Sequence, residues 1–148
     1  MNIAALQTGF GTEVPDRISC NIYVAGCQNN KACERSKCQN KHLHSFSAGR
    51  NAITWYEEIR GLIRKECISA VCILGGEPFD QEPHSMIHLV RHILVTRNLP
   101  VYVYTGYEQQ NIPGWAVKIP WAGIFAGPYV EGRPELQGWI EMELLQVS

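Results

Sequence analysis

The sequence predicts a single α/β domain in which mainly parallel strands form an incomplete β/α barrel. Two observations favour this fold class. Short apolar runs alternate along the chain with segments of helical periodicity, an order that is typical of parallel sheets. The chain has 148 residues and contains no repeat, low-complexity tract or linker, so residues 1–148 are expected to share one core.

The first predicted strand covers residues 18–26, where apolar and polar side chains alternate. A polar loop without helical or strand periodicity follows it. The first helix is predicted over residues 51–66, because apolar side chains recur there at helical spacing: Ile53, Tyr56, Ile59, Leu62 and Ile63. This part of the chain therefore supplies the first strand and the first helix of the alternating pattern.

The pattern continues through the middle of the chain. Residues 69–76 form a short apolar run that ends in two glycines and fits a buried parallel strand. Residues 83–98 are predicted as the second helix, with Pro83 in its first turn, and residues 100–106 as the third strand. Three later segments are expected to be short strands: residues 115–120, 121–127 and 138–147.

The composition excludes several classes of protein. Hydrophobic residues make up 45% of the chain and charged residues 18%, which fits a globular rather than a disordered protein. The net charge of −1 provides no long-range attraction to nucleic acid or to an anionic membrane. No apolar run approaches the roughly 20 residues of a membrane span, and the first residues lack the features of a signal peptide. We therefore expect a cytoplasmic protein with reduced thiols and no nucleic-acid or membrane partner.

Three unusual segments each follow a predicted strand. A loop that contains three cysteines, residues 26–44, follows the first strand, residues 75–78 (GGEP) follow the second, and residues 105–107 (TGY) follow the third. Ligands of parallel sheets bind beyond the carboxyl ends of the strands. The sequence therefore predicts one site that is built from these three segments.

The cysteine loop has the composition of a metal site. Cys27, Cys33 and Cys38 lie close together in the sequence, and clustered thiols in a reducing compartment more often bind metal than form disulfides. Three interpretations of the loop are open at this point. They are a zinc site completed by His42, a [4Fe-4S] cluster with three protein ligands and one open iron, and a loop without metal.

The GGEP segment also allows two interpretations. Two glycines at the end of a strand let the backbone approach a ligand closely, and Glu77 adds a carboxylate where parallel sheets place their ligands. The same residues are compatible with a tight turn between a strand and a helix, with an acidic side chain at the helix start.

Other candidate residues are expected to have structural roles. Cys20 and Cys72 lie inside predicted strands and are expected in the core. His84, His88 and His92 are spaced by four residues, and we expect a solvated or interface stripe rather than a metal site. Three late tryptophans fit either an interface or a core: Trp115, Trp121 and Trp139.

Four stretches carry a resemblance to a known family: YVAGCQNNKACERSKCQN, ILGGEPFDQ, VYVYTGYE and GIFAGPYVEG. In these stretches the chain resembles the radical S-adenosylmethionine (SAM) superfamily. The likeness is closer to its short members, the activating proteins of anaerobic ribonucleotide reductase. The stretches occur in the family's order and cover most of the chain. The cysteine spacing differs, because the family's usual CX3CX2C is CX5CX4C here, with two residues added in each gap.

The resemblance implies a site and its cofactors. Cys27, Cys33 and Cys38 would hold three irons of a [4Fe-4S] cluster, and SAM would chelate the fourth iron through its amino and carboxylate groups. Asn40 matches an asparagine that follows the family's third cysteine. The GGEP turn would bind the methionyl amino group, through backbone and carboxylate, and the third strand end would line the adenosine half of SAM. The residues implied in these two contacts are Gly75, Gly76, Glu77, Pro78, Tyr104, Thr105 and Gly106.

The implied activity is reductive cleavage of SAM to a 5′-deoxyadenosyl radical. This radical would abstract hydrogen from a glycine of a partner reductase, with the electron supplied by an external donor. The resemblance assigns no catalytic residue. Two alternatives stay open, namely a radical SAM enzyme that acts on a small molecule or nucleotide, and a non-catalytic module that binds zinc or an iron–sulfur cluster.

Overall fold

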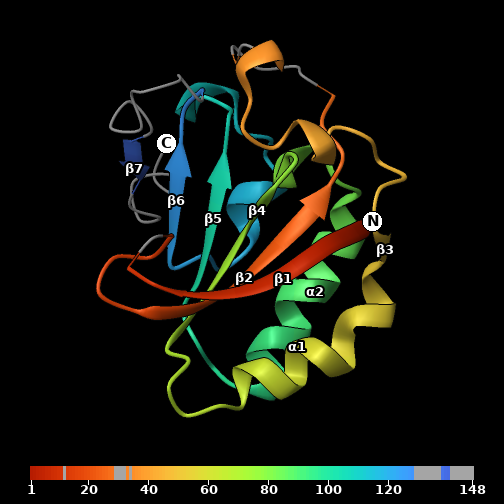
Figure 1. The fold of residues 1–148 in the computed structure, drawn as a ribbon. Helices are drawn as coiled ribbons and strands as arrows, with labels where there is room; N and C mark the ends of the chain where they lie inside the picture. The colour runs from red at the N-terminus through yellow and green to blue at the C-terminus, as the bar shows by residue number, and fades with distance from the viewer. Residues whose placement is uncertain (12, 29–32, 34, 129–137, 141–148) are drawn as a thin grey trace.

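The structure, a computed structural model, describes residues 1–11, 13–28, 33, 35–128 and 138–140. Within these residues, seven strands form one sheet in the order β3-β1-β2-β4-β5-β6-β7 (Figure 1). Their bounds are β1 Asn2–Phe10, β2 Ile18–Ala25, β3 Arg50–Asn51, β4 Ala70–Gly75, β5 Val101–Thr105, β6 Gly123–Ala126 and β7 Gly138–Ile140. The two α-helices of the described part are α1, Tyr56–Ile63, and α2, Pro83–Thr96. No helix in the described residues is long and apolar enough to span a bilayer.

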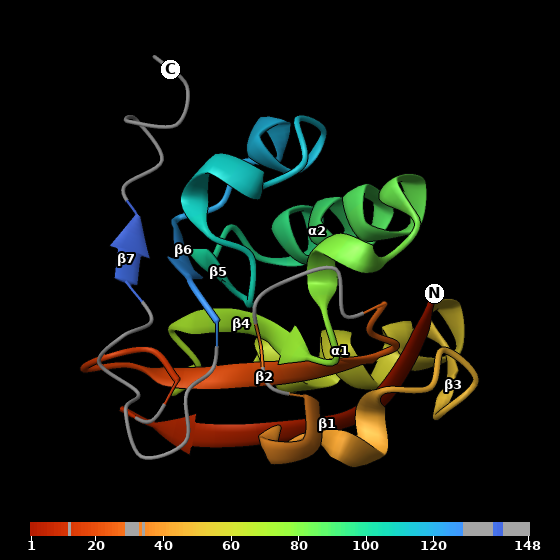
Figure 2. The same ribbon diagram turned by 90° about the horizontal axis from the view of Figure 1, so that it is seen from above.

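The sheet is mixed, so the prediction of mainly parallel strands is only partly met. The central strands β2, β4, β5 and β6 pair in parallel. The outer strands β1, β3 and β7 pair antiparallel with their neighbours. Figure 2 shows β3 and β7 on opposite sides of the molecule, at the two ends of the strand order. The α/β class is confirmed, whereas the curvature of a partial barrel stays a prediction.

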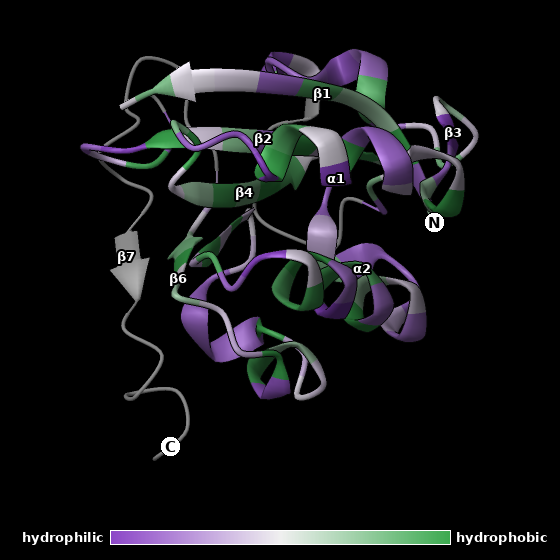
Figure 3. Ribbon diagram, turned by 90° about the horizontal axis from the view of Figure 1, so that it is seen from below, coloured by the Kyte–Doolittle hydropathy of each residue, from purple (hydrophilic) through white to green (hydrophobic). Residues whose placement is uncertain are grey.

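The larger part of the core lies between one face of the sheet and the helices. Alternate residues of β2 and β4, including Ile22 and Ile73, pack with Ile59 of α1 and with Met86 and Ile93 of α2, all at 0% exposure. Figure 3 shows hydrophobic colouring along β2 and β4 and mixed colouring on both helices, as amphipathic helices require. Burying each such aliphatic side chain stabilises the fold by about 1.5–3 kcal/mol.

A smaller cluster covers the other face of the sheet. It contains Val14, Ala70 and Cys72, with Leu74 and Tyr104 packed against them. Cys20, on the opposite face, belongs to the larger cluster. Both cysteines have 0% exposure, which confirms the prediction that they are core residues.

Several elements differ from those predicted. Strand β1 was not predicted, because its residues do not alternate in polarity, although Ile3 is fully buried. Residues 115–120 were expected to be a strand, but Ala116–Lys118 form a 3-10 helix. The predicted helix at 51–66 begins as a 3-10 turn, Ala52–Trp55, before α1. Of the strand predicted at 138–147, β7 is its first part, and residues 141–148 lie outside the described residues.

Candidate functional site

The carboxyl ends of β2, β4 and β5 meet at one edge of the sheet. The backbone N–H of Glu77, after β4, donates to the Gly26 carbonyl, after β2, at 2.8 Å. The Glu77 carboxylate accepts hydrogen bonds from the Thr105 hydroxyl and from the backbone N–H of Gly106, both at 2.8 Å. Figure 1 shows the loop after β2 at the end of the sheet toward which the arrows of β5 and β6 point. The three segments that follow the strands therefore meet, as predicted, and their role as a binding site stays a prediction.

The Glu77 side chain fixes this meeting point. It has 0% exposure, and its carboxylate also accepts the N–H of Phe79 at 3.0 Å, as the N-cap of a 3-10 turn at Pro78–Asp80. Hydrogen bonds to a buried carboxylate compensate the cost of removing its charge from water. The sequence allowed either a ligand contact or a structural role in the turn for this carboxylate. These hydrogen bonds give it a positioning role between the ends of β4 and β5, and the ligand contact stays a prediction.

Two glycines let the ends of β4 and β2 lie in contact. Gly75 has a φ of +117°, and a Cβ atom there would lie 2.5 Å from the Val24 carbonyl oxygen. A Cβ atom at Gly76 would lie 2.5 Å from the carbonyl oxygen of Gly26 and 2.8 Å from that of Leu43. All these neighbours are backbone atoms that cannot rotate away. The glycines are therefore required by the close packing of the turn on the loop, which is the structural part of the GGEP signal.

The cysteine loop is held at both of its ends. At its start, the N–H of Gly26 donates to the Leu43 carbonyl at 2.8 Å, and the N–H of Cys27 donates to the His44 carbonyl at 3.1 Å. These two bonds join the start of the loop to its return. Cys27 is buried, at 7% exposure, so the first thiol lies against the body of the protein.

The third cysteine is linked to the GGEP turn through one residue. The backbone N–H of Asn40 donates to Cys38 Sγ at 3.4 Å, and the Asn40 side-chain amide donates to the Gly75 carbonyl at 3.1 Å. An N–H group directed at sulfur stabilises a thiolate and tunes the potential of an iron–sulfur cluster. Cys33 is partly exposed between these two anchors, and residues 29–32 and 34 lie outside the described residues.

A second set of polar residues holds the start of the loop. Asp80 Oδ2 accepts the backbone N–H of Gln28 at 2.8 Å, and Asp80 Oδ1 accepts the Tyr107 hydroxyl. Gln81, which is buried, donates from Nε2 to the carbonyls of Gly26 and Glu77. Burial and the Asp80 carboxylate raise the pKa of Tyr107, so its hydroxyl remains a neutral donor. The sequence analysis included Tyr107 in the third segment but assigned no role to Asp80 or Gln81, although both follow the GGEP turn directly.

The third strand end divides its residues between the two faces of the sheet. Thr105 and Gly106 lie at the meeting point with Glu77. Tyr104 belongs to the cluster on the other face, where its hydroxyl donates to the Glu13 carbonyl at 2.8 Å and its ring stacks on Phe125 at 4.5 Å. Tyr104 therefore lies on the face of the sheet that the helices do not cover. Its predicted role beside a cofactor stays a prediction.

The donor set fits a multi-iron cluster. A single zinc ion would draw its sulfur ligands to about 2.3 Å from one point. His42, the fourth ligand of the zinc interpretation, is exposed. A cubane cluster takes thiolate ligands and bonds each of them to a different iron. Three thiols on a loop with fixed ends, one of which accepts an N–H bond, suit the cluster.

Comparison with known proteins agrees with this assignment. The structure is that of an α/β protein with a three-cysteine loop at the carboxyl edge of its sheet. The model of one family, described as a 4Fe-4S single cluster domain, matches residues 9–117, a segment that includes the cysteine loop and the GGEP turn. This match covers more than half of the chain, so the protein belongs to the 4Fe-4S single cluster domain family. No curated protein matches the sequence.

Proposed function

We propose that this protein is a radical SAM enzyme that generates a glycyl radical on a partner enzyme such as anaerobic ribonucleotide reductase. In this proposal Cys27, Cys33 and Cys38 hold the [4Fe-4S] cluster, and the fourth iron is left for SAM. When bound, the cluster supplies the electron that cleaves SAM reductively to methionine and a 5′-deoxyadenosyl radical. The family match supports the cluster, and the sequence resemblance supports SAM as its substrate.

The observation that carries the proposal is the position of Asn40. Its backbone N–H reaches the Cys38 sulfur, and its side chain reaches the Gly75 carbonyl. One residue thus joins the third thiol to the turn that resembles the SAM-binding turn of radical SAM enzymes. A protein that used its cysteines only as a structural clip would have no requirement for this connection.

The other residues of the site act as a frame in this proposal. Glu77 keeps the ends of β4 and β5 together, so that the backbone of the turn has one defined shape. Asp80 and Tyr107 hold the first residues of the loop, next to Cys27. Burial of Cys27 shields that side of the site from water. Pre-organised positions of this kind lower the cost of placing a cofactor and a substrate.

The partner is proposed to be a protein. The described residues form one sheet with two α-helices, which leaves little material for enclosing a large substrate, so a docking protein would complete the site. The proposal also requires an external electron donor, because the reaction consumes one electron for each SAM that is cleaved.

The first experiment tests the cofactor and the reaction together. The protein is purified and reconstituted without oxygen, and iron, sulfide and zinc are measured. We expect about four irons and four sulfides per chain, and an EPR spectrum of the reduced protein that changes when SAM is added. With dithionite and SAM, 5′-deoxyadenosine should accumulate.

A matched pair of cysteine variants provides the control. Cys38→Ala should lose the cluster and the formation of 5′-deoxyadenosine, whereas Cys67→Ala should retain both, because Cys67 is exposed and outside the loop. One zinc per chain without sulfide, and no response to SAM, would contradict the proposal. The partner is tested separately, by incubating the active protein with an anaerobic ribonucleotide reductase and looking for the EPR signal of a glycyl radical.

A further inference from the structure

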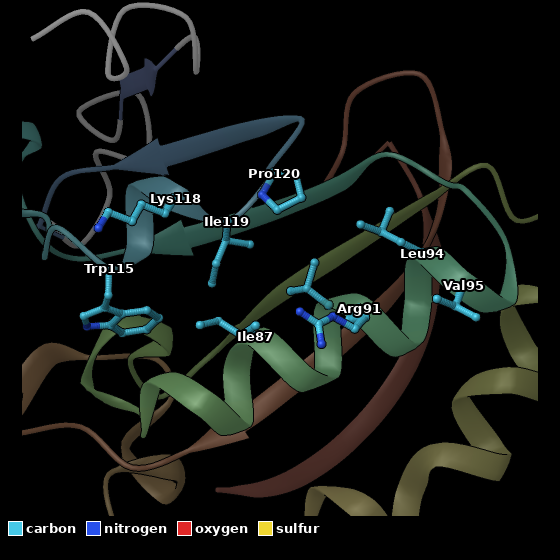
Figure 4. A pocket seen from close by; sticks show the side chains of 9 residues that line it. Ile87, Arg91, Leu94, Val95, Trp115, Lys118, Ile119 and Pro120 are labelled. Atoms are coloured by element: carbon cyan, nitrogen blue, oxygen red, sulfur yellow. The ribbon is translucent and has the colours of Figure 1, made fainter.

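A cavity of about 450 Å³ lies on the helix side of the molecule, apart from the cysteine loop. One wall is α2, which contributes Ile87, Leu94 and Val95, and the other wall is the segment of residues 115–120. Figure 4 shows Trp115 and Ile119 facing the helix across this space. The volume is within the range of about 300–1,000 Å³ that is usual for small-molecule sites.

The walls of the cavity are mainly apolar. An apolar cavity binds water weakly, so an apolar group that enters it gains contacts at little cost in hydration. Val95 extends this surface to the outside, with 81% of its side chain exposed. The cavity is therefore suited to the apolar part of a ligand that projects toward solvent.

The charged groups of the cavity all have the same sign. Arg91 comes from α2 and Lys118 from the opposite wall, and none of the lining residues in the described part of the chain is acidic. Two cations beside an apolar space favour an anion and disfavour a cation. Figure 4 shows the two cations apart from each other, with the Lys118 ammonium group directed away from α2.

We propose that this cavity binds an amphipathic anion, with an apolar chain or ring between α2 and Trp115 and a carboxylate or similar group near Arg91, while Lys118 adds positive charge from the opposite wall. The site is separate from the proposed cluster. Two contacts connect the cavity to the GGEP turn. Trp115 packs edge-to-face on Phe79, with ring centroids 6.1 Å apart, and the Phe79 N–H donates to the Glu77 carboxylate. Nothing in the proposal depends on SAM chemistry.

The test is calorimetric titration of the full-length reconstituted protein with decanoate, and with decyltrimethylammonium as the cation with the same chain. We expect saturable binding of one decanoate per protein and at least tenfold weaker binding of the cation. Arg91→Glu combined with Lys118→Glu should weaken decanoate binding about tenfold. Each variant is first checked for unchanged iron content and circular dichroism.

A second pair of variants addresses the apolar wall. Val95→Asp should weaken decanoate binding, whereas Ile53→Asp should not, because Ile53 is similarly exposed, at 67%, but lies outside the cavity. The proposal is overturned if decanoate does not bind, if Val95→Asp has no effect, or if the cation binds equally well. It is also overturned if sedimentation shows a dimer of the chain that Val95→Asp dissociates. None of these outcomes tests the proposed cluster, which is measured by iron and sulfide content and by EPR.

Discussion

Tyr107 and Asp80 form a hydrogen-bonded pair that connects the end of β5 to the start of the cysteine loop. The Tyr107 hydroxyl donates to one oxygen of Asp80, while the other oxygen accepts the backbone N–H of Gln28 at 2.8 Å. Gln28 is the residue after Cys27. The pair therefore acts on the first thiol of the loop through the backbone.

Removing the Tyr107 hydroxyl should loosen the loop. Tyr107→Phe is expected to reduce the free energy of unfolding of the protein without cluster by about 1–2 kcal/mol, because Asp80 loses a donor. It should also slow cluster reconstitution, measured by absorbance near 400 nm. Tyr23→Phe is the control, since the Tyr23 hydroxyl has no hydrogen bond within the described residues. Equal reconstitution rates in wild type and Tyr107→Phe would contradict the role of the pair.

Glu77→Gln should destabilise the fold by about 2–4 kcal/mol. The amide replaces one acceptor oxygen with a donor, so at least one of the buried groups that now donate to Glu77 loses its partner. Urea unfolding of the protein without cluster measures the change. Glu66→Gln, at an exposed position, should change stability little. Unchanged stability in Glu77→Gln would mean that the carboxylate does not hold the strand ends together.

Two glycine variants should have opposite effects. Gly76→Ala should destabilise the protein by about 1–3 kcal/mol, because its Cβ would overlap the backbone oxygens of Gly26 and Leu43. Gly61→Ala should stabilise it by about 0.5–1 kcal/mol, because Gly61 lies in α1 and its Cβ would meet no atom within 4 Å. Urea midpoints of the two variants test both signs. A tolerated Gly76→Ala would show that the turn does not need close contact with the loop.

Alkylation by iodoacetamide should separate the cysteines into classes. Burial raises the pKa of the Cys20 thiol to about 11 and raises that of Cys72 well above its usual value, so both remain protonated thiols at pH 8. Cys67 is exposed and should react first. Mass spectrometry of the native protein gives the order, and protection of the three loop cysteines should appear only after reconstitution. Rapid labelling of Cys20 would contradict its place in the core.

The contact between α1 and α2 should weaken in mild acid. His92 stacks on Tyr56 at 4.2 Å, and burial, with further effects from Arg60 and His88, lowers its pKa below the usual 6.5. The folded state favours the neutral imidazole of His92. The stability that neutral His92 contributes is therefore complete above pH 6.5. It declines as the pH falls from 6.5 through the lower pKa that His92 has in the folded protein.

Unfolding in urea at pH 7.5 and pH 5.5 measures this effect. The loss of stability between the two pH values should be smaller in His92→Phe, which keeps a stacking ring but cannot be protonated. His84→Gln should retain the full loss, because the surroundings of His92 are unchanged. An identical loss in wild type and His92→Phe would show that other groups cause the pH dependence.

The sequence predicted the central strands and the meeting of their ends better than it predicted the edges of the sheet. The strands at 18–26, 69–76 and 100–106 are present within one or two residues, because each is a short apolar run between clear turn signals. Their order predicted that the cysteine loop, the GGEP turn and Thr105 would meet, and hydrogen bonds join them. The histidine stripe was expected to be solvated or to lie at an interface, and His88 and His92 contact Tyr56 of α1.

The remaining features depend on tertiary contacts. Strand β1 lacks alternation because several of its side chains are exposed on both faces, and it is held as a strand by its pairing with β2. Asp80 and Gln81 were assigned no role from the sequence, and Tyr107 was only part of the TGY segment. Their roles follow from the proximity of segments more than twenty residues apart. The same is true of Glu77, whose partners on β5 are remote in sequence.

The attachment of the loop has a consequence for how related proteins are detected. Its backbone is fixed to the rest of the protein at residues 26–28 and again at residues 40–44. Lengthening the connection between two fixed points costs only about 0.6 kcal/mol for each doubling of its length. The number of residues between the cysteines can therefore change during evolution while both attachments of the loop are kept. A search that demands one spacing would overlook such chains, whereas a search for an asparagine shortly after the last cysteine, followed by a strand that ends in GGEP, would find them.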